Sequence, residues 1–73
     1  MIEVRLFATL RDGRGKVSQI EADTVSQAGD LLKQLGIEQE AVAILLINGF
    51  HSKPEDTVKD GDVVSLFPPV GGG

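Results

Sequence analysis

Cysteine is absent from the 73-residue chain, and histidine occurs only once, at His51. Without cysteine the domain has no disulfide, although domains below about 80 residues often rely on such cross-links. A structural zinc site is also disfavoured, because such sites are built from several Cys and His ligands. We expect His51 to be an ordinary surface residue. Stability must therefore come from a small core of sheet and helix.

Basic residues are also few, with seven Lys and Arg against eleven Asp and Glu and a net charge of −4. An acidic domain fits the phosphate backbone poorly, so we expect no nucleic-acid partner. The longest apolar run, residues 41–47, is far shorter than the ~20 residues that span a bilayer, so no membrane association is expected. The first residues lack the basic-then-apolar layout of a signal peptide, and a cytoplasmic location is the default expectation.

Recognisable catalytic patterns are lacking too. The sequence contains neither a P-loop nor a G-x-G-x-x-G motif, and one histidine does not complete a catalytic triad. Asp60 and Asp62 flank Gly61 and are predicted to form a turn rather than a carboxylate pair for acid–base catalysis. A domain this small buries only about 60% of the surface that its unfolded chain exposes, which disfavours a deep active site. We therefore expect no catalytic constellation within the chain itself.

Alternating apolar residues at the start of the chain predict a strand over residues 2–10 with one buried face. Phe7 breaks the alternation because it lies on the polar side. Residues 16–22 predict a second, weaker strand, and the glycine-rich turn at 12–15 joins the two. The opening third of the chain is therefore predicted to be an antiparallel hairpin.

The second half of the chain carries further strand signals. Residues 43–47 are continuously apolar and predict a central strand that is buried on both faces. Asn48-Gly49 is a strong tight-turn signal and leads into a short strand near residues 50–52. The last strand is predicted at residues 63–67, and Pro68 ends it because proline cannot donate a ladder hydrogen bond.

One helix is predicted over residues 25–35, where apolar residues recur at helical spacing. Thr24 and Gln27 fit a capping box, and Asp23 suits the positive end of the helix dipole. Gly36 follows the last apolar position and can adopt the left-handed conformation that ends many helices. Together these elements predict an α+β domain, a mixed sheet of four to five strands with one helix on one face.

The chain ends in a run of glycines after two prolines. The prolines favour an extended exit from the domain, and glycine lets the backbone approach another chain or a nucleotide closely. The terminal carboxylate is a poor electrophile and needs activation before a nucleophile can attack it. We therefore expect a folded domain over residues 1–70 and a flexible glycine tail over residues 71–73.

The segment Phe67-Pro68-Pro69-Val70 closely resembles the C-terminus of molybdopterin synthase small subunits, the MoaD branch of the MoaD/ThiS sulfur carriers. In that family a Phe-Pro-Pro-Val run precedes a variable small residue and Gly-Gly. The likeness covers the whole chain, with Asp60-Gly61-Asp62, Ile47-Asn48-Gly49, Phe7 and Arg11 in matching places. The resemblance implies the ubiquitin-like β-grasp fold.

The resemblance also implies how the tail would act. A ubiquitin-activating-type enzyme uses ATP to adenylate Gly73, and a sulfur donor converts the acyl adenylate into a thiocarboxylate. The large subunit of molybdopterin synthase then accepts the tail and passes the sulfur to the pterin precursor, commonly within a heterotetramer. The chain would thus be a non-catalytic carrier subunit of a sulfurtransferase that binds no cofactor itself. The implied site residues are Gly73 and Gly72 for the chemistry, and Phe7, Arg11, Phe67, Pro68, Pro69, Val70 and Gly71 for partner binding.

Phe7 and Phe67 predict a partner surface beside the tail. Both lie on the polar side of strands that are parallel neighbours in a β-grasp sheet, so their rings can form one exposed apolar patch. Arg11, Arg14 and Lys16 add positive charge around the first turn that could pair with acidic groups on a partner. For Arg14 and Lys16 an ordinary solvated loop is an equally good interpretation.

Three other functions remain open. A ThiS-type carrier would use the same tail to supply sulfur for thiamine thiazole synthesis, and a ubiquitin-like modifier would join Gly73 to lysines of other proteins. A small interaction module with an idle tail is the third. The Phe-Pro-Pro-Val run favours the molybdopterin branch, within which the sequence does not distinguish a molybdenum pathway from a tungsten pathway.

Overall fold

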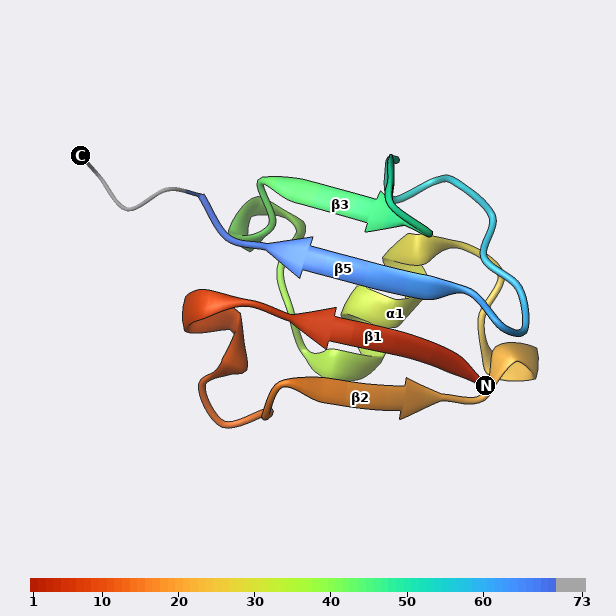
Figure 1. The fold of residues 1–73 in the computed structure, drawn as a ribbon, viewed down its shortest axis with the longest axis horizontal. Helices are drawn as coiled ribbons and strands as arrows, with labels where there is room; N and C mark the ends of the chain where they lie inside the picture. The colour runs from red at the N-terminus through yellow and green to blue at the C-terminus, as the bar shows by residue number, and fades with distance from the viewer. Residues whose placement is uncertain (70–73) are drawn as a thin grey trace.

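The computed structural model describes residues 1–69, which form one mixed sheet with an α-helix packed on one face (Figure 1). The sheet strands are β1 (Ile2–Leu6), β2 (Val17–Ile20), β3 (Ile44–Ile47), β4 (Phe50–His51) and β5 (Val63–Phe67). The helix α1 spans Ala28–Leu35, and three short 3₁₀ turns are η1 (Ala8–Arg11), η2 (Ala22–Thr24) and η3 (Gln39–Ala41). The predicted α+β architecture is confirmed.

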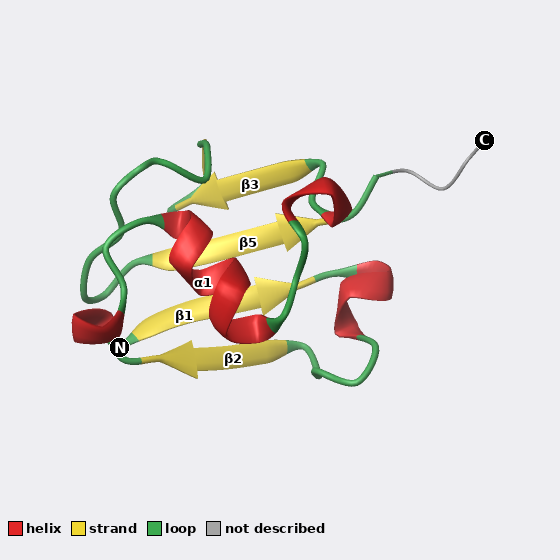
Figure 2. Cartoon of the chain, turned by 180° about the vertical axis from the view of Figure 1, so that it is seen from behind, coloured by secondary structure: helices red, strands yellow, loops and turns green. Residues whose placement is uncertain are grey.

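Strand β5, the last element of the described chain, lies in the middle of the sheet. The strand order is β2-β1-β5-β3-β4, with β1 and β5 parallel and the other pairs antiparallel. Because β1 and β5 are parallel, their C-terminal ends lie at the same end of the sheet, at the left in Figure 1. Helix α1 crosses the back of these strands, as Figure 2 shows from behind.

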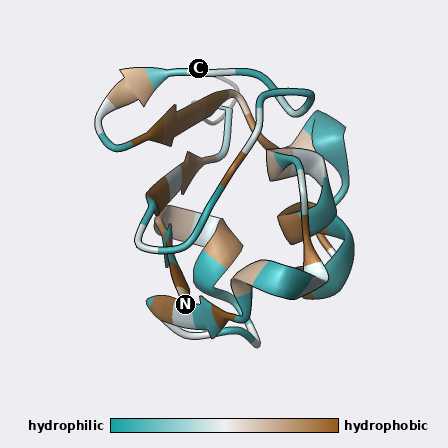
Figure 3. Cartoon of the chain, turned by 90° about the vertical axis from the view of Figure 1, so that its right-hand side faces the viewer, coloured by the Kyte–Doolittle hydropathy of each residue, from teal (hydrophilic) through white to brown (hydrophobic). Residues whose placement is uncertain are grey.

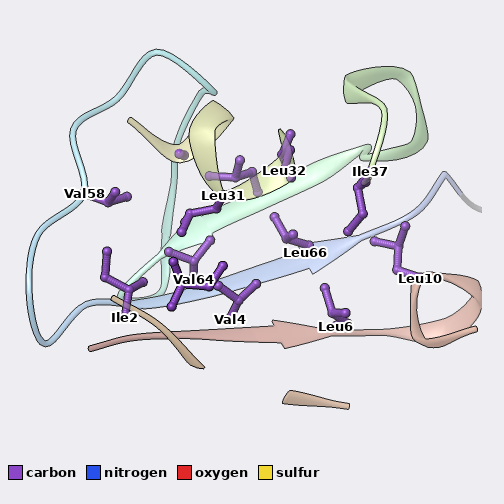
Figure 4. Packing of buried hydrophobic residues seen from close by; sticks show 13 residues of the cluster. Ile2, Val4, Leu6, Leu10, Leu31, Leu32, Ile37, Val58, Val64 and Leu66 are labelled. Atoms are coloured by element: carbon purple, nitrogen blue, oxygen red, sulfur yellow. The ribbon is translucent and has the colours of Figure 1, made fainter. Parts of the chain in front are cut away.

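The core lies between α1 and the inward face of the sheet. Alternate residues of β1 and β5 are fully buried and point toward Leu31 and Leu32 of the helix (Figure 4). Those strand residues are Ile2, Val4, Leu6, Val64 and Leu66. Fully burying one such side chain contributes about 1.5–3 kcal/mol, so these positions fix which face of each strand points inward. Coloured by hydropathy, the strands are mostly brown and much of the helical layer is teal (Figure 3).

The first strand is shorter than predicted. It ends at Leu6 rather than residue 10, because Ala8 adopts a left-handed conformation (φ 53°) and the chain turns into η1. Leu10 is still buried, but it reaches the core from this turn and not from a strand. The apolar alternation was thus a correct guide to burial except at Ala8, which is exposed, and a wrong guide to the strand end.

The interpretation of residues 43–47 as a central strand buried on both faces is wrong. Leu45 points into the core, whereas Ile44 on the opposite face is 39% exposed. The helix covers only one face of the sheet in residues 1–69, and β5 occupies the middle position. The following turn is confirmed: Asn48 and Gly49 both have positive φ (53° and 84°), as the two-residue β3–β4 turn requires.

The predicted helix start is also wrong. Helix α1 begins at Ala28, and the capping box consists of Gln27 and Asp30 rather than Thr24 and Gln27. The backbone N–H groups of Ser26 and Gln27 donate to the Asp30 carboxylate, and these bonds lower its pKa. The predicted end is confirmed, since Gly36 adopts the left-handed conformation (φ 70°) just after Leu35.

Residues 25–27 stay extended because they contact a distant segment. Gln27 forms an isolated bridge with Thr57, the Val58 N–H donates to the Ser26 carbonyl, and the Ala28 N–H donates to that of Asp56. Asp23 lies in η2 and not at the helix start. These hydrogen bonds satisfy backbone groups that a helix would otherwise have used, so the tertiary contact outweighs the local capping signal.

Candidate functional site

Two aromatic side chains meet where the C-terminal ends of β1 and β5 lie side by side. The rings of Phe7 and Phe67 are stacked, with centroids 4.3 Å apart and an angle of 10° between their planes. The backbone aligns them, since β1 and β5 run in parallel register and the Phe7 N–H donates to the Leu66 carbonyl at 3.2 Å. The proximity predicted for these two residues is confirmed, but both side chains are half-buried rather than exposed.

Arg11 lies against this pair of rings. Its Nε donates to the Leu6 carbonyl at 2.8 Å, and its guanidinium carbon lies 5.4 Å from the centroid of the Phe7 ring. A guanidinium at this distance from an aromatic face makes a favourable cation–π contact. The structure thus brings together three of the predicted partner-binding residues.

Two further apolar residues extend the surface on β3. Ile44 pairs with Phe67 across the β3–β5 ladder, and Leu46, two residues on, lies on the same face. Ile44 is exposed and Leu46 is half-buried. We call Phe7, Phe67, Ile44 and Leu46 the open-face patch. The sequence analysis missed Ile44 and Leu46 because they lie within an unbroken apolar run. The only available signal was that successive strand residues lie on opposite faces, which separates Ile44 and Leu46 from Leu45 and Ile47.

The part of this sheet face formed by β1 is charged, whereas Val17 of β2, which pairs with Arg5, is apolar and 50% exposed. Arg5 and Glu3 of β1 form an ion pair with an Nε–Oε2 distance of 2.5 Å, and the hydrogen bond from Arg5 lowers the pKa of Glu3. An exposed pair of this kind adds little to stability. The open-face patch therefore has a polar border of opposite charges along β1, as protein interfaces commonly have around an apolar centre.

Arg14 is neither free in a solvated loop nor aimed outward. Its guanidinium donates to the carbonyls of Leu35 (3.1 Å) and Gly36 (3.2 Å) at the end of α1, and to that of Leu10 (3.2 Å). A positive charge on the last carbonyls of a helix is stabilising. Arg14 therefore has a structural role, whereas Lys16 is exposed.

The Asp60-Gly61-Asp62 and Asn48-Gly49 turns form one structural network. Asp62 is buried, and its carboxylate accepts hydrogen bonds from the Asn48 side chain and the Lys59 N–H, both at 2.9 Å. The Asn48 side-chain oxygen accepts from the Val63 N–H at 2.9 Å.

Asp60 instead is exposed and pairs with the amino group of Met1, which lowers the pKa of Asp60. The interpretation of this motif as a turn, not a catalytic pair, is consistent with these separate partners.

His51 is exposed on β4, as expected. Within residues 1–69, no group of three or more His, Cys, Asp or Glu side chains is placed to hold a metal ion. None of the helices in this range combines the length and apolarity needed to cross a membrane.

The predicted reactive residues, Gly72 and Gly73, come a few positions after Phe67 of the open-face patch. Pro68 and Pro69 come directly after β5, which ends at Phe67 as predicted. Val70, Gly71, Gly72 and Gly73 lie outside the described residues, and so does the predicted boundary between domain and tail. Their roles, and the partner-binding roles of Pro68 and Pro69, stay predictions.

Comparisons with known proteins agree with this geometry. The sequence model of the ThiS family matches residues 4–73. Small archaeal modifier protein 3 of Haloferax volcanii is 34% identical, with 99% of this chain and 98% of that protein covered. The crystal structure of SAMP1 from the same organism superposes with a TM-score of 0.78 at 26% identity, covering 99% of this chain and 98% of that one.

A third relative was solved together with a protein partner. The complex of subunits 1 and 2 of molybdopterin-converting factor from Helicobacter pylori 26695 contains a chain with a TM-score of 0.66 and 27% identity. That match covers 99% of this chain and 97% of the other. These neighbours confirm the β-grasp fold. With 70 of 73 residues matched by the family model, the chain belongs to the ThiS/MoaD family of ubiquitin-like sulfur carriers.

Proposed function

We propose that this protein carries sulfur for molybdopterin biosynthesis on the carboxyl group of Gly73. In the first step an adenylating enzyme joins the carboxylate to AMP, with release of pyrophosphate from ATP. A sulfur donor then displaces AMP and leaves a thiocarboxylate. In the large synthase subunit the thiocarboxylate sulfur then passes to the pterin precursor, and water takes its place on the acyl carbon, which restores the carboxylate of Gly73.

One observation carries this proposal: the open-face patch lies at the end of β5, directly before the chain leads into its glycine tail. A carrier must be held by its domain while its tail enters a partner's active site. A patch of aromatic and aliphatic side chains with a charged border is the usual chemistry of such a holding surface. Phe7, Phe67 and Arg11, with Pro68, Pro69, Val70 and Gly71, are the proposed partner-binding residues.

Two observations support molybdopterin synthesis as the use of the carried sulfur. The Phe67-Pro68-Pro69-Val70 run is typical of the MoaD branch, and one structural neighbour is a molybdopterin-converting factor subunit in complex with its partner subunit. The corresponding partners here are an adenylating enzyme of the ubiquitin-activating type and a large synthase subunit.

Intact mass spectrometry tests the loading step. The chain is incubated with its cognate adenylating enzyme, ATP and a sulfur donor. We expect a mass increase equal to the replacement of one oxygen by sulfur, located at Gly73 by fragmentation and dependent on ATP. An unchanged mass in the complete reaction would refute the proposed function.

Replacing Phe67 by alanine is expected to weaken binding to both partners by about 30-fold, because buried aromatic anchors at interfaces commonly contribute about 2 kcal/mol. Isothermal titration calorimetry with the adenylating enzyme, and separately with the large subunit, measures this loss. Phe50→Ala is the matched control, since Phe50 is 76% exposed and lies at the other end of β3. Equal affinities of the two variants would contradict a role for the patch, provided that both remain folded.

A second candidate function is that of a protein modifier. It is favoured by the 34% identity to a protein named small archaeal modifier protein 3 over nearly the full length of both chains. The same adenylated Gly73 would then react with lysine amines. Peptides from cell lysate in which a lysine carries the C-terminal glycines of this chain would support this function. Rescue of a molybdenum-cofactor defect, and not of a thiamine defect, separates the MoaD role from the ThiS role.

A further inference from the structure

The side chain of Arg11 is held within its own domain and is not simply a charge at the rim of the open-face patch. Its Nε donates to the Leu6 carbonyl at 2.8 Å. Its own carbonyl accepts from the N–H groups of Arg14 and Gly15, both at 2.9 Å. Arg11 is thus fixed through its side chain and its backbone at the same time.

The turn that carries Arg11 is itself anchored. After Phe7 the chain enters η1 through Ala8, and Leu10 in this turn is buried in the core. Leu10 also donates its N–H to the Phe7 carbonyl at 3.2 Å. Because the turn folds back on the end of β1, the guanidinium of Arg11 returns to the ring of Phe7, 5.4 Å from its centroid.

Phe7 therefore has two partners. The ring of Phe67 is stacked on it with centroids 4.3 Å apart, and the guanidinium carbon of Arg11 lies 5.4 Å from the centroid of the Phe7 ring. Through Phe7, these contacts link the turn after β1 to Phe67, the last residue of β5, two positions before the end of the described chain at Pro69.

We propose that Arg11 is a positioning residue, which holds Phe7 against Phe67. It thereby fixes the surface that the two rings present to a partner and the point at which the chain leaves β5. This proposal rests on the proposed function, and it assigns the effect of Arg11 to its contact with Phe7 rather than to a carboxylate on the partner. The guanidinium is needed, because it places a delocalised charge beside the ring while its Nε donates to the Leu6 carbonyl, and the compact ammonium of a lysine cannot reproduce both contacts.

The free protein gives the first test. The sequence has three phenylalanines, so their ring resonances can be assigned individually by NMR. Arg11→Lys is expected to shift the ring protons of Phe7 and Phe67 and to leave those of exposed Phe50 unchanged. Lys33→Met, which removes a cation from helix α1, should shift none of them. Unshifted Phe7 and Phe67 resonances in Arg11→Lys would overturn the proposal.

A double-mutant cycle on binding to the adenylating enzyme gives the second test. Arg11→Lys should weaken binding about fivefold, as expected for the loss of one cation–π contact. In the Phe7→Ala background the same substitution should change affinity less than about twofold, because the ring on which Arg11 acts is gone. An equal loss in both backgrounds would mean that the partner contacts the guanidinium directly, and full affinity with lysine would mean that the charge alone is sufficient. Either result would overturn the proposal. Failure of wild-type loading in the mass experiment would refute the proposed function alone, since the NMR result does not depend on a partner.

Discussion

Deletion of Gly73 is expected to reduce thiocarboxylate formation by at least about 100-fold, although the shortened chain still ends in a glycine carboxylate. One residue of extended chain spans about 3.5 Å, so the carboxyl group of Gly72 would stop short of the activating nucleotide by about that distance. Reacting atoms must approach to about 3–3.5 Å, and a displacement of 1 Å alone can cost about 100-fold. Intact mass after a timed reaction with the adenylating enzyme, ATP and sulfur donor measures the loss.

Two controls separate tail length from other effects. The deletion should leave the thermal denaturation midpoint unchanged, because Gly73 lies beyond β5 and the core residues end at Leu66. Gly73→Ala keeps the length and the carboxylate but adds a methyl group, so its defect reports how narrow the partner's channel is. If the chain without Gly73 forms a thiocarboxylate at Gly72 as fast as the intact chain does at Gly73, the assignment of the reactive group is wrong.

Replacement of Asp62 by alanine is expected to destabilise the domain by about 3 kcal/mol. The substitution leaves two donors, the Asn48 side-chain amide and the Lys59 N–H, without their acceptor in a partly buried place. A hydrogen bond to a charged group contributes about 1.5–3 kcal/mol, and an unpaired buried donor adds its own penalty. For a domain this small, we expect the denaturation midpoint to fall by about 12–20 °C in differential scanning calorimetry.

Asp60→Ala is the matched control for this prediction, since it removes the same side chain from the same turn. Asp60 is exposed and pairs only with an exposed amino group, so its loss should change the midpoint little. Asp62→Asn keeps one acceptor oxygen and should fall between the two. Similar midpoints for Asp62→Ala and Asp60→Ala would contradict the importance of the network.

The sequence predicted the elements whose signals are local. Alternating burial in β1 and the left-handed Gly36 each depend on residues a few positions apart, and each was found as expected. The start of α1 was missed because Gln27 pairs with Thr57, thirty positions away, and no local pattern reports such a contact. The likeness of the whole chain to a known family supplied the parallel pairing of the first and last strands, which periodicity alone could not give.

The candidate site was predicted in part for a similar reason. Phe7 and Phe67 stood out because each interrupts a polar face, and the parallel strands bring them together. Ile44 and Leu46 did not stand out, because an unbroken apolar strand looks the same whether its second face is covered by the same chain or left open. The sequence therefore indicated how apolar β3 is, and the position of α1 on one face of the sheet was needed to learn which side of β3 faces outward.

The central position of β5 also governs when this protein becomes competent during its synthesis. Glu3 pairs with Val63, sixty positions later, so the pairing of β1 with β5 joins the first and the last of the described strands to be synthesised. Contacts so distant in sequence carry a large loop-closure cost and form late in folding. A nascent or truncated chain that stops before β5 lacks both the middle of its sheet and Phe67. Partners that recognise the stacked rings would therefore engage only chains in which β5 has been synthesised and paired with β1.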